Sequence, residues 1–216
     1  MKKRYEITEK QLTFLNGFLL RKYPDISDTT RIELTDHLVS DFEATTDNGN
    51  LSQYLSNELE FIRKFVFNGV REVKKTYSRQ TWNCFFDFFS NFKMIPYTLL
   101  IVVILFSLYK KLDNRELWMS LIIIQSIIML LSILFGMINK KKLRKLDEVK
   151  YLGAEIWLPF LMIQIPQGLE FQDVLMSNEY VFILYSLFTV VYGLSAFIVL
   201  RIQRKYILEK YKHLLN

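Results

Sequence analysis

The chain of 216 residues is poor in the residue types that build most recognised catalytic and metal sites. Its single cysteine, Cys84, excludes an internal disulfide and a cysteine-rich zinc site. The two histidines, His37 and His213, stand at no recognised metal-binding spacing. Seven glycines leave little for a phosphate-binding loop, and no Walker, G-x-S-x-G or H-E-x-x-H motif occurs. We therefore expect no catalytic, metal or cofactor site, and a protein that is not an enzyme.

Long uncharged runs are abundant in the second half of the sequence. Residues 117–138 form a run of 22 residues without a charge, and residues 180–200 form one of 21. A helix of 22 residues is about 33 Å long, enough to cross a hydrocarbon core of about 30 Å. Residues 93–109 form a third apolar stretch, and residues 156–165 form a shorter fourth. We expect an all-α protein in which residues 93–216 form a four-helix transmembrane bundle with a basic tail.

Charged residues in the loops predict the orientation of these spans. The formal net charge of +6 belongs to the second half, because residues 1–92 hold 13 basic and 13 acidic side chains. Six Lys and Arg residues lie in 139–153 and five follow Leu200, whereas 170–180 has none and holds three acids. Since Lys and Arg in short loops stay on the cytoplasmic side, we expect a multi-pass protein of the cell inner (cytoplasmic) membrane with both termini in the cytoplasm. The basic charge is then a topology signal, and no direct nucleic-acid partner is expected.

Residues 1–69 have the pattern of a small cytoplasmic helical domain. Thr8 and Gln11 form a capping-box pattern ahead of a first helix with apolar residues at helical spacing. Two further helices are expected to end at Asn-Gly pairs, at Gly49 and Gly69, because glycine accepts the left-handed conformation that ends a helix.

Acidic residues dominate the middle of this domain. Residues 25–60 contain nine acidic side chains and one basic one, Arg31, which gives a local charge of −8. A hydrated surface explains this pattern without any function. The functional alternative is a docking surface for a basic partner protein, held away from the anionic inner leaflet by like-charge repulsion. The expected contributors are Glu33, Asp36, Asp41 and Glu43.

The order of elements in residues 1–69 resembles the HAAS-type domain found at the N-terminus of many bacterial membrane proteins. The resemblance rests on a helix that ends near Pro24, an acidic helix that ends at Gly49, and a Ser-capped helix closed by Gly69, and it covers about 60 of the 216 residues. Family members commonly close the third helix with Gly-Asp-Pro, whereas here Gly69 is followed by Val70 and Arg71. The resemblance implies a role in signalling or regulation, often beside PadR-like transcription regulators.

Residues 70–92 carry cations followed by aromatic side chains, directly ahead of the first apolar stretch. This order predicts an amphipathic aromatic helix at the lipid bilayer surface, with basic groups on anionic headgroups and rings at headgroup depth. Single-stranded nucleic acid is the alternative partner for such a pattern. The residues are Arg71, Lys74, Lys75, Arg79, Trp82, Phe85, Phe86, Phe88, Phe89 and Phe92.

Three polar residues lie in or beside the apolar stretches: Gln125, Glu155 and Gln164. Glu155 near a cytoplasmic end can reach water or pair with Lys150. A polar cluster of the three beside a helix broken by Pro159 would instead line a transport path, as the discontinuous helices of transporters do.

Two pairs of small residues predict close helix packing: Ser132 with Gly136, and Thr189 with Gly193. Packing within the chain is the first interpretation, and a homo-oligomer is the second. Taken together, the sequence predicts an integral membrane protein that acts as a regulatory, signalling or scaffold component through its acidic cytoplasmic domain. A transport component is the alternative.

Overall fold

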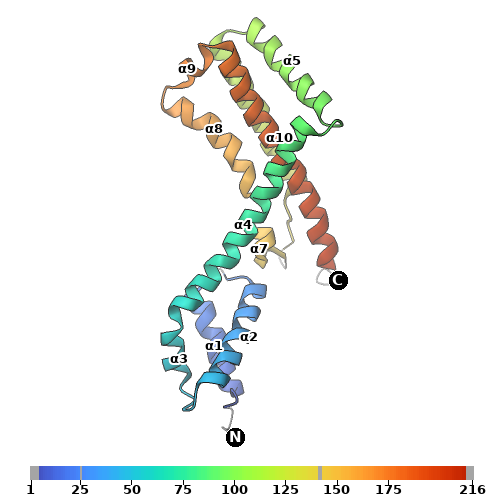
Figure 1. Cartoon of the computed structure of the whole chain (residues 1–216). Helices are drawn as coiled ribbons and strands as arrows, with labels where there is room; N and C mark the ends of the chain where they lie inside the picture. The colour runs from blue at the N-terminus through green and yellow to red at the C-terminus, as the bar shows by residue number, and fades with distance from the viewer. Residues whose placement is uncertain (1–4, 25, 141–142, 213–216) are drawn as a thin grey trace. The chain divides into compact units, whose positions relative to one another are not determined.

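The computed structural model describes residues 5–24, 26–140 and 143–212, and every regular element within these ranges is helical (Figure 1). The predicted all-α class is confirmed. The helices are α1 (Glu9–Lys22), α2 (Asp28–Thr45), α3 (Leu51–Asn57), α4 (Leu59–Ser90), α5 (Ile95–Lys111), α6 (Asn114–Gly136), α7 (Asp147–Lys150), α8 (Trp157–Gly168), α9 (Gln172–Met176) and α10 (Glu179–Lys210), with short 3-10 turns η1 (Leu143–Lys145) and η2 (Ala154–Ile156).

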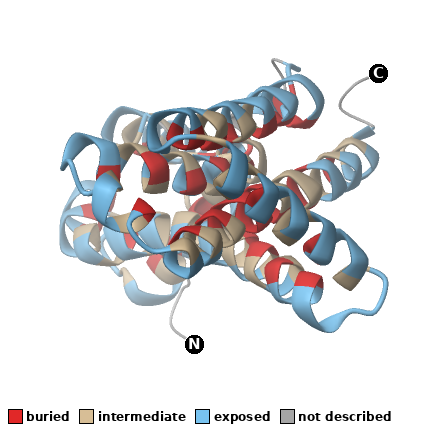
Figure 2. Cartoon of the chain, turned by 90° about the horizontal axis from the view of Figure 1, so that it is seen from above, coloured by how far each residue is buried: buried red, intermediate tan, exposed pale blue. Residues whose placement is uncertain are grey.

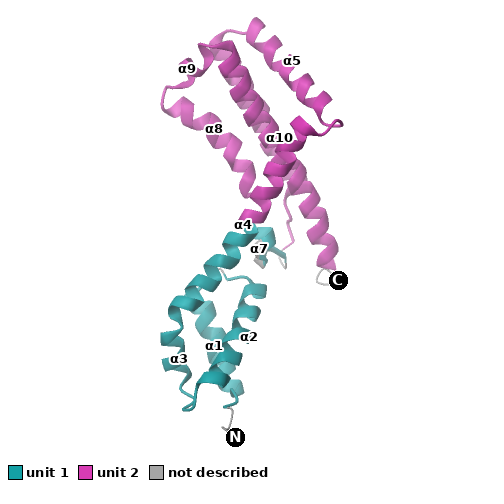
Figure 3. Ribbon diagram, in the orientation of Figure 1, with its two compact units in different colours: residues 1–73, 141–150 teal, residues 74–140, 151–216 magenta. Residues whose placement is uncertain are grey.

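The chain divides into two compact units (Figure 3). Unit 1 comprises residues 1–73 and 141–150, and unit 2 comprises residues 74–140 and 151–216. Helix α4 begins in unit 1 and ends in unit 2. The domain boundaries expected from the sequence, after residues 69 and 92, stay predictions.

Unit 1 is built around its own apolar core. The helices start where the sequence provides caps: Thr8 forms a complete capping box with Gln11, and Ser27 and Asn50 accept the amide protons of Thr30 and Gln53. Behind these caps, apolar residues at helical spacing turn to the same side. The core residues are Leu15, Leu19, Leu34, Leu38, Phe42, Leu51, Tyr54, Leu55 and Ile62.

The third helix differs from the prediction. Instead of one helix that ends at Gly69, α3 breaks at Glu58 and α4 then continues without interruption to Ser90. Gly49 does adopt the left-handed conformation, with φ of 64°, but Gly69 does not. A helical glycine is tolerated there because α4 keeps burying residues beyond it, at Tyr77, Phe85 and Phe88. Packing therefore overrides the Asn-Gly stop signal.

In unit 2, α6 and α10 run parallel to each other. Gly193 lies against Gln125 and Gly136 against Leu200, so both helices advance in the same direction. Helix α8 runs the other way along α10, because the earlier Glu155 meets Tyr192 while the later Met162 meets Tyr185.

Two polar contacts join the end of α5 to the start of α10 and to the end of α9. Lys110 Nζ lies 2.8 Å from a Glu179 carboxylate oxygen, and the Tyr109 hydroxyl donates to the Met176 carbonyl at 3.2 Å. We call this the Glu179 end of unit 2. The opposite end, which holds Gly136, Leu200 and η2, is called the Leu200 end.

Two helices, α6 and α10, are long and apolar enough to cross a membrane. A third candidate exists if α4 and α5, which meet at an angle of 83°, form one broken span. Helix α8, with 12 residues, is only about 18 Å long. Many large apolar side chains of α5 and α6 are exposed, among them Leu99, Val103, Ile123 and Leu130, whereas other positions of these helices are buried. Figure 2 colours buried residues red and exposed residues pale blue along the chain. These features indicate a membrane protein.

Candidate functional site

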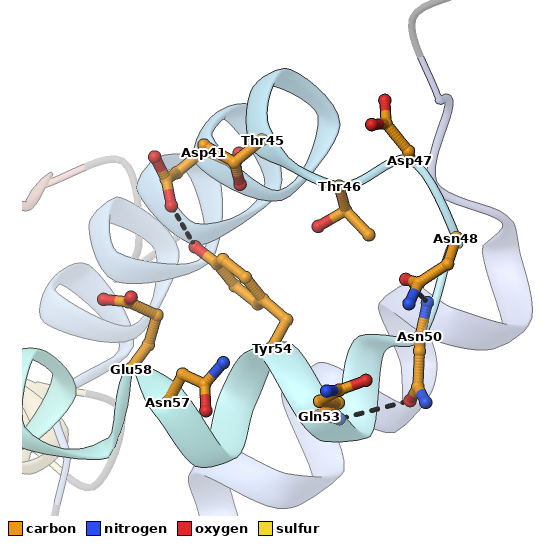
Figure 4. Close-up of a pocket in the computed structure, with 10 residues that line it drawn as sticks. All are labelled: Asp41, Thr45, Thr46, Asp47, Asn48, Asn50, Gln53, Tyr54, Asn57 and Glu58. Carbon is orange, nitrogen blue, oxygen red and sulfur yellow. Dashed lines mark hydrogen bonds between the residues drawn. The ribbon is translucent and has the colours of Figure 1, made fainter.

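A polar hollow of about 580 Å³ opens on unit 1 where α2 turns into α3 (Figure 4). Its lining contains three carboxylates and otherwise consists of hydroxyl and amide side chains with one tyrosine. The residues are Asp41, Thr45, Thr46, Asp47, Asn48, Asn50, Gln53, Tyr54, Asn57 and Glu58. We call it the acidic hollow.

Tyr54 forms the wall of the acidic hollow and links α3 to α2. Its side chain is 9% exposed, and its hydroxyl donates to an Asp41 carboxylate oxygen at 2.7 Å. Burial raises the pKa of the Tyr54 hydroxyl, and the hydrogen bond to Asp41 and the charge of that carboxylate raise it further. The phenol is therefore a neutral donor at physiological pH, and it fixes the position of the Asp41 carboxylate.

The four acids predicted to bind a partner divide into two kinds. Glu33 and Asp36 are exposed on α2. Asp41 and Glu43 are half-buried and hold the fold: Asp41 accepts from Tyr54, and Glu43 accepts from the Ile7 amide at 2.9 Å. Of the four acids, only Glu33 and Asp36 are therefore exposed carboxylates that do not hold other parts of the fold in place.

Carboxylates can accept hydrogen bonds from ammonium or guanidinium groups, the cationic groups of Lys and Arg side chains. Across the part of the chain that the structure describes, no group of three or more His, Cys, Asp or Glu side chains is arranged to hold a metal ion. Three carboxylates, Asp41, Asp47 and Glu58, therefore lie among hydroxyl and amide groups in the acidic hollow.

Two of the polar residues singled out in unit 2, Gln125 and Glu155, have different hydrogen-bonding surroundings. Gln125 is completely buried on α6, and neither its amide oxygen nor its amide nitrogen has a hydrogen-bond partner in the described residues. Glu155 accepts from the hydroxyl of Tyr192, which is also fully buried. Gln125 and Glu155 therefore meet adjacent residues of α10, Gly193 and Tyr192.

Gln164 does not join this pair. It lies half-buried on α8, nine residues beyond Glu155, which corresponds to about 14 Å along a helix. Gln125 forms no hydrogen bond to Gln164 or to Glu155, so the polar cluster of the alternative interpretation is not seen. The three residues are thus spread over the bundle and form no continuous polar cluster.

The small residues of α6 and α10 lie at the contact between these helices. Ser132 and Thr189 are fully buried, and their hydroxyls donate to carbonyls of their own helices. A Cβ atom at Gly136 would lie 1.9 Å from Leu200 Cδ2, and one at Gly193 would lie 2.9 Å from Gln125 Nε2. Close approach within one chain therefore uses both glycines, while a contact between two copies stays a prediction.

Sequence reasoning missed the two tyrosines that organise these groups, Tyr54 and Tyr192. One feature of the sequence could have indicated them: each tyrosine lies among apolar residues at helical spacing, and a buried hydroxyl needs a hydrogen-bond acceptor. The acceptors in the structure are the carboxylates of Asp41 and Glu155.

Comparisons of the chain with protein-family models, with curated proteins and with solved structures give no match.

Proposed function

We propose that the protein is a membrane-anchored regulatory or scaffold component that binds a basic partner protein through unit 1. In this proposal unit 2 is the anchor, and α2 with the acidic hollow is the docking surface. The resemblance of residues 1–69 to HAAS-type domains is in keeping with a signalling role. Both termini lie in the cytoplasm of a four-crossing protein of the inner membrane.

The direction of the helices in unit 2 supports four crossings. Two parallel spans, α6 and α10, require the chain between them to return across the membrane. Helix α8 runs in that return direction. Since α8 alone covers about 18 Å, η2 and the residues up to α9 complete the return in this proposal. The end of α4 together with α5, the bent pair that can form one broken span, supplies the first crossing in this proposal.

One observation carries the functional proposal: unit 1 has a complete apolar core of its own and still exposes uncompensated acids. Nine core residues come from α1, α2, α3 and α4. Neither Glu33 nor Asp36 has an ion-pair partner among the described residues. A surface of this kind is available for a basic partner without any change in the fold.

The test is a double charge reversal, Glu33→Lys with Asp36→Lys, in the full chain. Asp41 and Glu43 are left intact because they hold α3 and residue Ile7 in place. The wild-type chain, purified in mild detergent, should capture a protein whose contact segment is basic, and the variant should lose it. Rim charges of this type contribute about 0.2–1 kcal/mol each, so the loss should be largest at low salt.

A matched control reverses two exposed acids elsewhere, Glu6→Lys with Glu72→Lys. This control has the same net charge as the test variant and should keep the partner. If test and control variants bind every wild-type partner equally well at low and physiological salt, the acidic surface is only hydrated and the proposal fails.

A transport component is the second candidate, because Gln125 is a buried amide without partners and α8 is short and contains Pro159 and Pro166. Under this candidate, Glu155→Gln and Gln164→Leu abolish solute flux in proteoliposomes while the chain stays folded. Flux that persists in both variants would exclude a path through these residues.

A further inference from the structure

One face of α4 carries exposed cations followed by exposed aromatic rings. Lys75 and Arg79 are exposed, and Phe86 and Phe89 are 58% and 44% exposed. At about 100° per residue these four positions fall within an arc of about 80° on the helix. Phe92, which follows α4, is 89% exposed. We call Lys75, Arg79, Phe86 and Phe89 the α4 face.

The aromatic rings of the α4 face pack against α10 indirectly, through Trp82 and Phe85. The Phe86 ring contacts Trp82 and Phe85, with centroids 5.9 and 5.5 Å away. Trp82 and Phe85 in turn contact Tyr192 of α10, at 5.1 and 6.1 Å. The exposed rings therefore lie beside a helix that is itself a candidate membrane span.

This contact sets the depth of the rings. Tyr192 lies eight residues before Leu200, where the uncharged run of α10 ends, which corresponds to about 12 Å. When α10 crosses a membrane, Phe86 and Phe89 lie inside the hydrocarbon region and not at headgroup depth, the position expected from the sequence. Exposed rings at that depth contact acyl chains.

With the same membrane placement, the cations of the α4 face lie toward the headgroups of the leaflet that the rings enter. Arg79 and Lys75 precede Phe86 by seven and eleven residues, or about 10 and 16 Å along α4. The neighbouring Lys74 lies over the Tyr151 ring, 4.6 Å from its centroid, and Tyr151 leads into η2 at the Leu200 end. Neither Lys75 nor Arg79 has an ion-pair partner in the ranges that the structure describes.

We propose that the α4 face is a binding site for anionic phospholipid of the inner leaflet: Phe86 and Phe89 insert among the acyl chains, and Lys75 and Arg79 bind the headgroup phosphates. The acidic residue nearest the rings, Asp87, is exposed and lies about 100° around the helix from Phe86, outside the arc of the α4 face. The inference depends on the membrane placement of unit 2 proposed above and is independent of the partner of unit 1.

The test measures which lipids the full chain retains. Purified protein is placed in nanodiscs of equal phosphatidylcholine and phosphatidylglycerol, and the co-purifying lipids are counted by native mass spectrometry. The wild type should retain phosphatidylglycerol preferentially. Each basic residue near an anionic surface contributes about a five-fold preference, so Lys75→Gln with Arg79→Gln should lower the retained ratio about 25-fold if both contribute fully, and about five-fold if only one does.

The control is Arg21→Gln with Lys22→Gln, which removes one exposed Arg and one exposed Lys of unit 1, outside the part of the chain proposed to lie in the membrane. It should keep the wild-type lipid ratio. Equal ratios in the test and control variants would overturn the site. A wild-type chain that stays out of nanodiscs would overturn the membrane placement itself, an outcome that is distinct from loss of partner binding by unit 1.

Depth is measured separately with a fluorescent label. Because Cys84 is the only cysteine, a Cys84→Ser background allows single labels at Phe86→Cys or Asp87→Cys. Lipids that carry a quencher on the acyl chain should quench the label at position 86 much more than the label at position 87. Equal quenching at both positions, or none at position 86, would contradict insertion of this face.

Discussion

At the scale of the residue, Gln125 is a buried side chain whose hydrogen-bonding atoms are both unsatisfied. Its amide is fully buried and both polar atoms lack partners in the described chain, beside the backbone of Gly193. A buried polar group without a hydrogen bond costs about 1–3 kcal/mol. We predict that Gln125→Leu raises the free energy of unfolding in detergent by about this amount, measured as a higher midpoint of thermal unfolding.

Gln164→Leu is the matched control, because Gln164 is only half-buried and should change the midpoint little. A lower midpoint for Gln125→Leu would mean that the amide has a partner, such as an internal water. In that case the buried amide would support the transport candidate.

At the scale of the element, the length of α4 depends on whether Gly69 ends a helix or lies inside one. A left-handed glycine that ends a helix resists alanine, whereas a glycine inside a helix costs about 0.5–1 kcal/mol relative to alanine. A Cβ atom at Gly69 would meet Thr30 at 3.6 Å, an ordinary contact. We predict that Gly69→Ala raises the free energy of unfolding of unit 1 by about 0.5–1 kcal/mol, measured by urea unfolding followed by circular dichroism.

Gly49→Ala provides the opposite case. Gly49 has φ of 64°, and a Cβ atom there would lie 2.5 Å from the Tyr5 ring, so this substitution should destabilise unit 1. If Gly69→Ala were as harmful as Gly49→Ala, α4 would end at Gly69, as the Asn-Gly signal indicated.

At the scale of the whole molecule, the proposed topology makes a direct prediction. Reporters fused after Asn216 or within residues 140–150 should report the cytoplasm, and one at Asp173 should report the outside. The reason is that Lys and Arg gather at the first two positions, while residues 170–180 contain three acids and no Lys or Arg. A cytoplasmic signal at Asp173 would make α8 a re-entrant segment and leave α6 and α10 without a return crossing.

The sequence by itself determined the helical class, the apolar runs at α6 and α10 and the caps of unit 1. These features depend on local composition and on hydrogen bonds between neighbours, which are visible in a linear chain. Only the tertiary structure decided that Asp41 and Glu43 hold the fold while Glu33 and Asp36 face outward, because those roles depend on Tyr54 and Ile7, 13 and 36 residues away. It also decided that α4 passes through Gly69 and that α6 and α10 are parallel. Burial of side chains between distant segments outweighs a local stop signal, and the direction of packing is set by contacts that local sequence patterns do not encode.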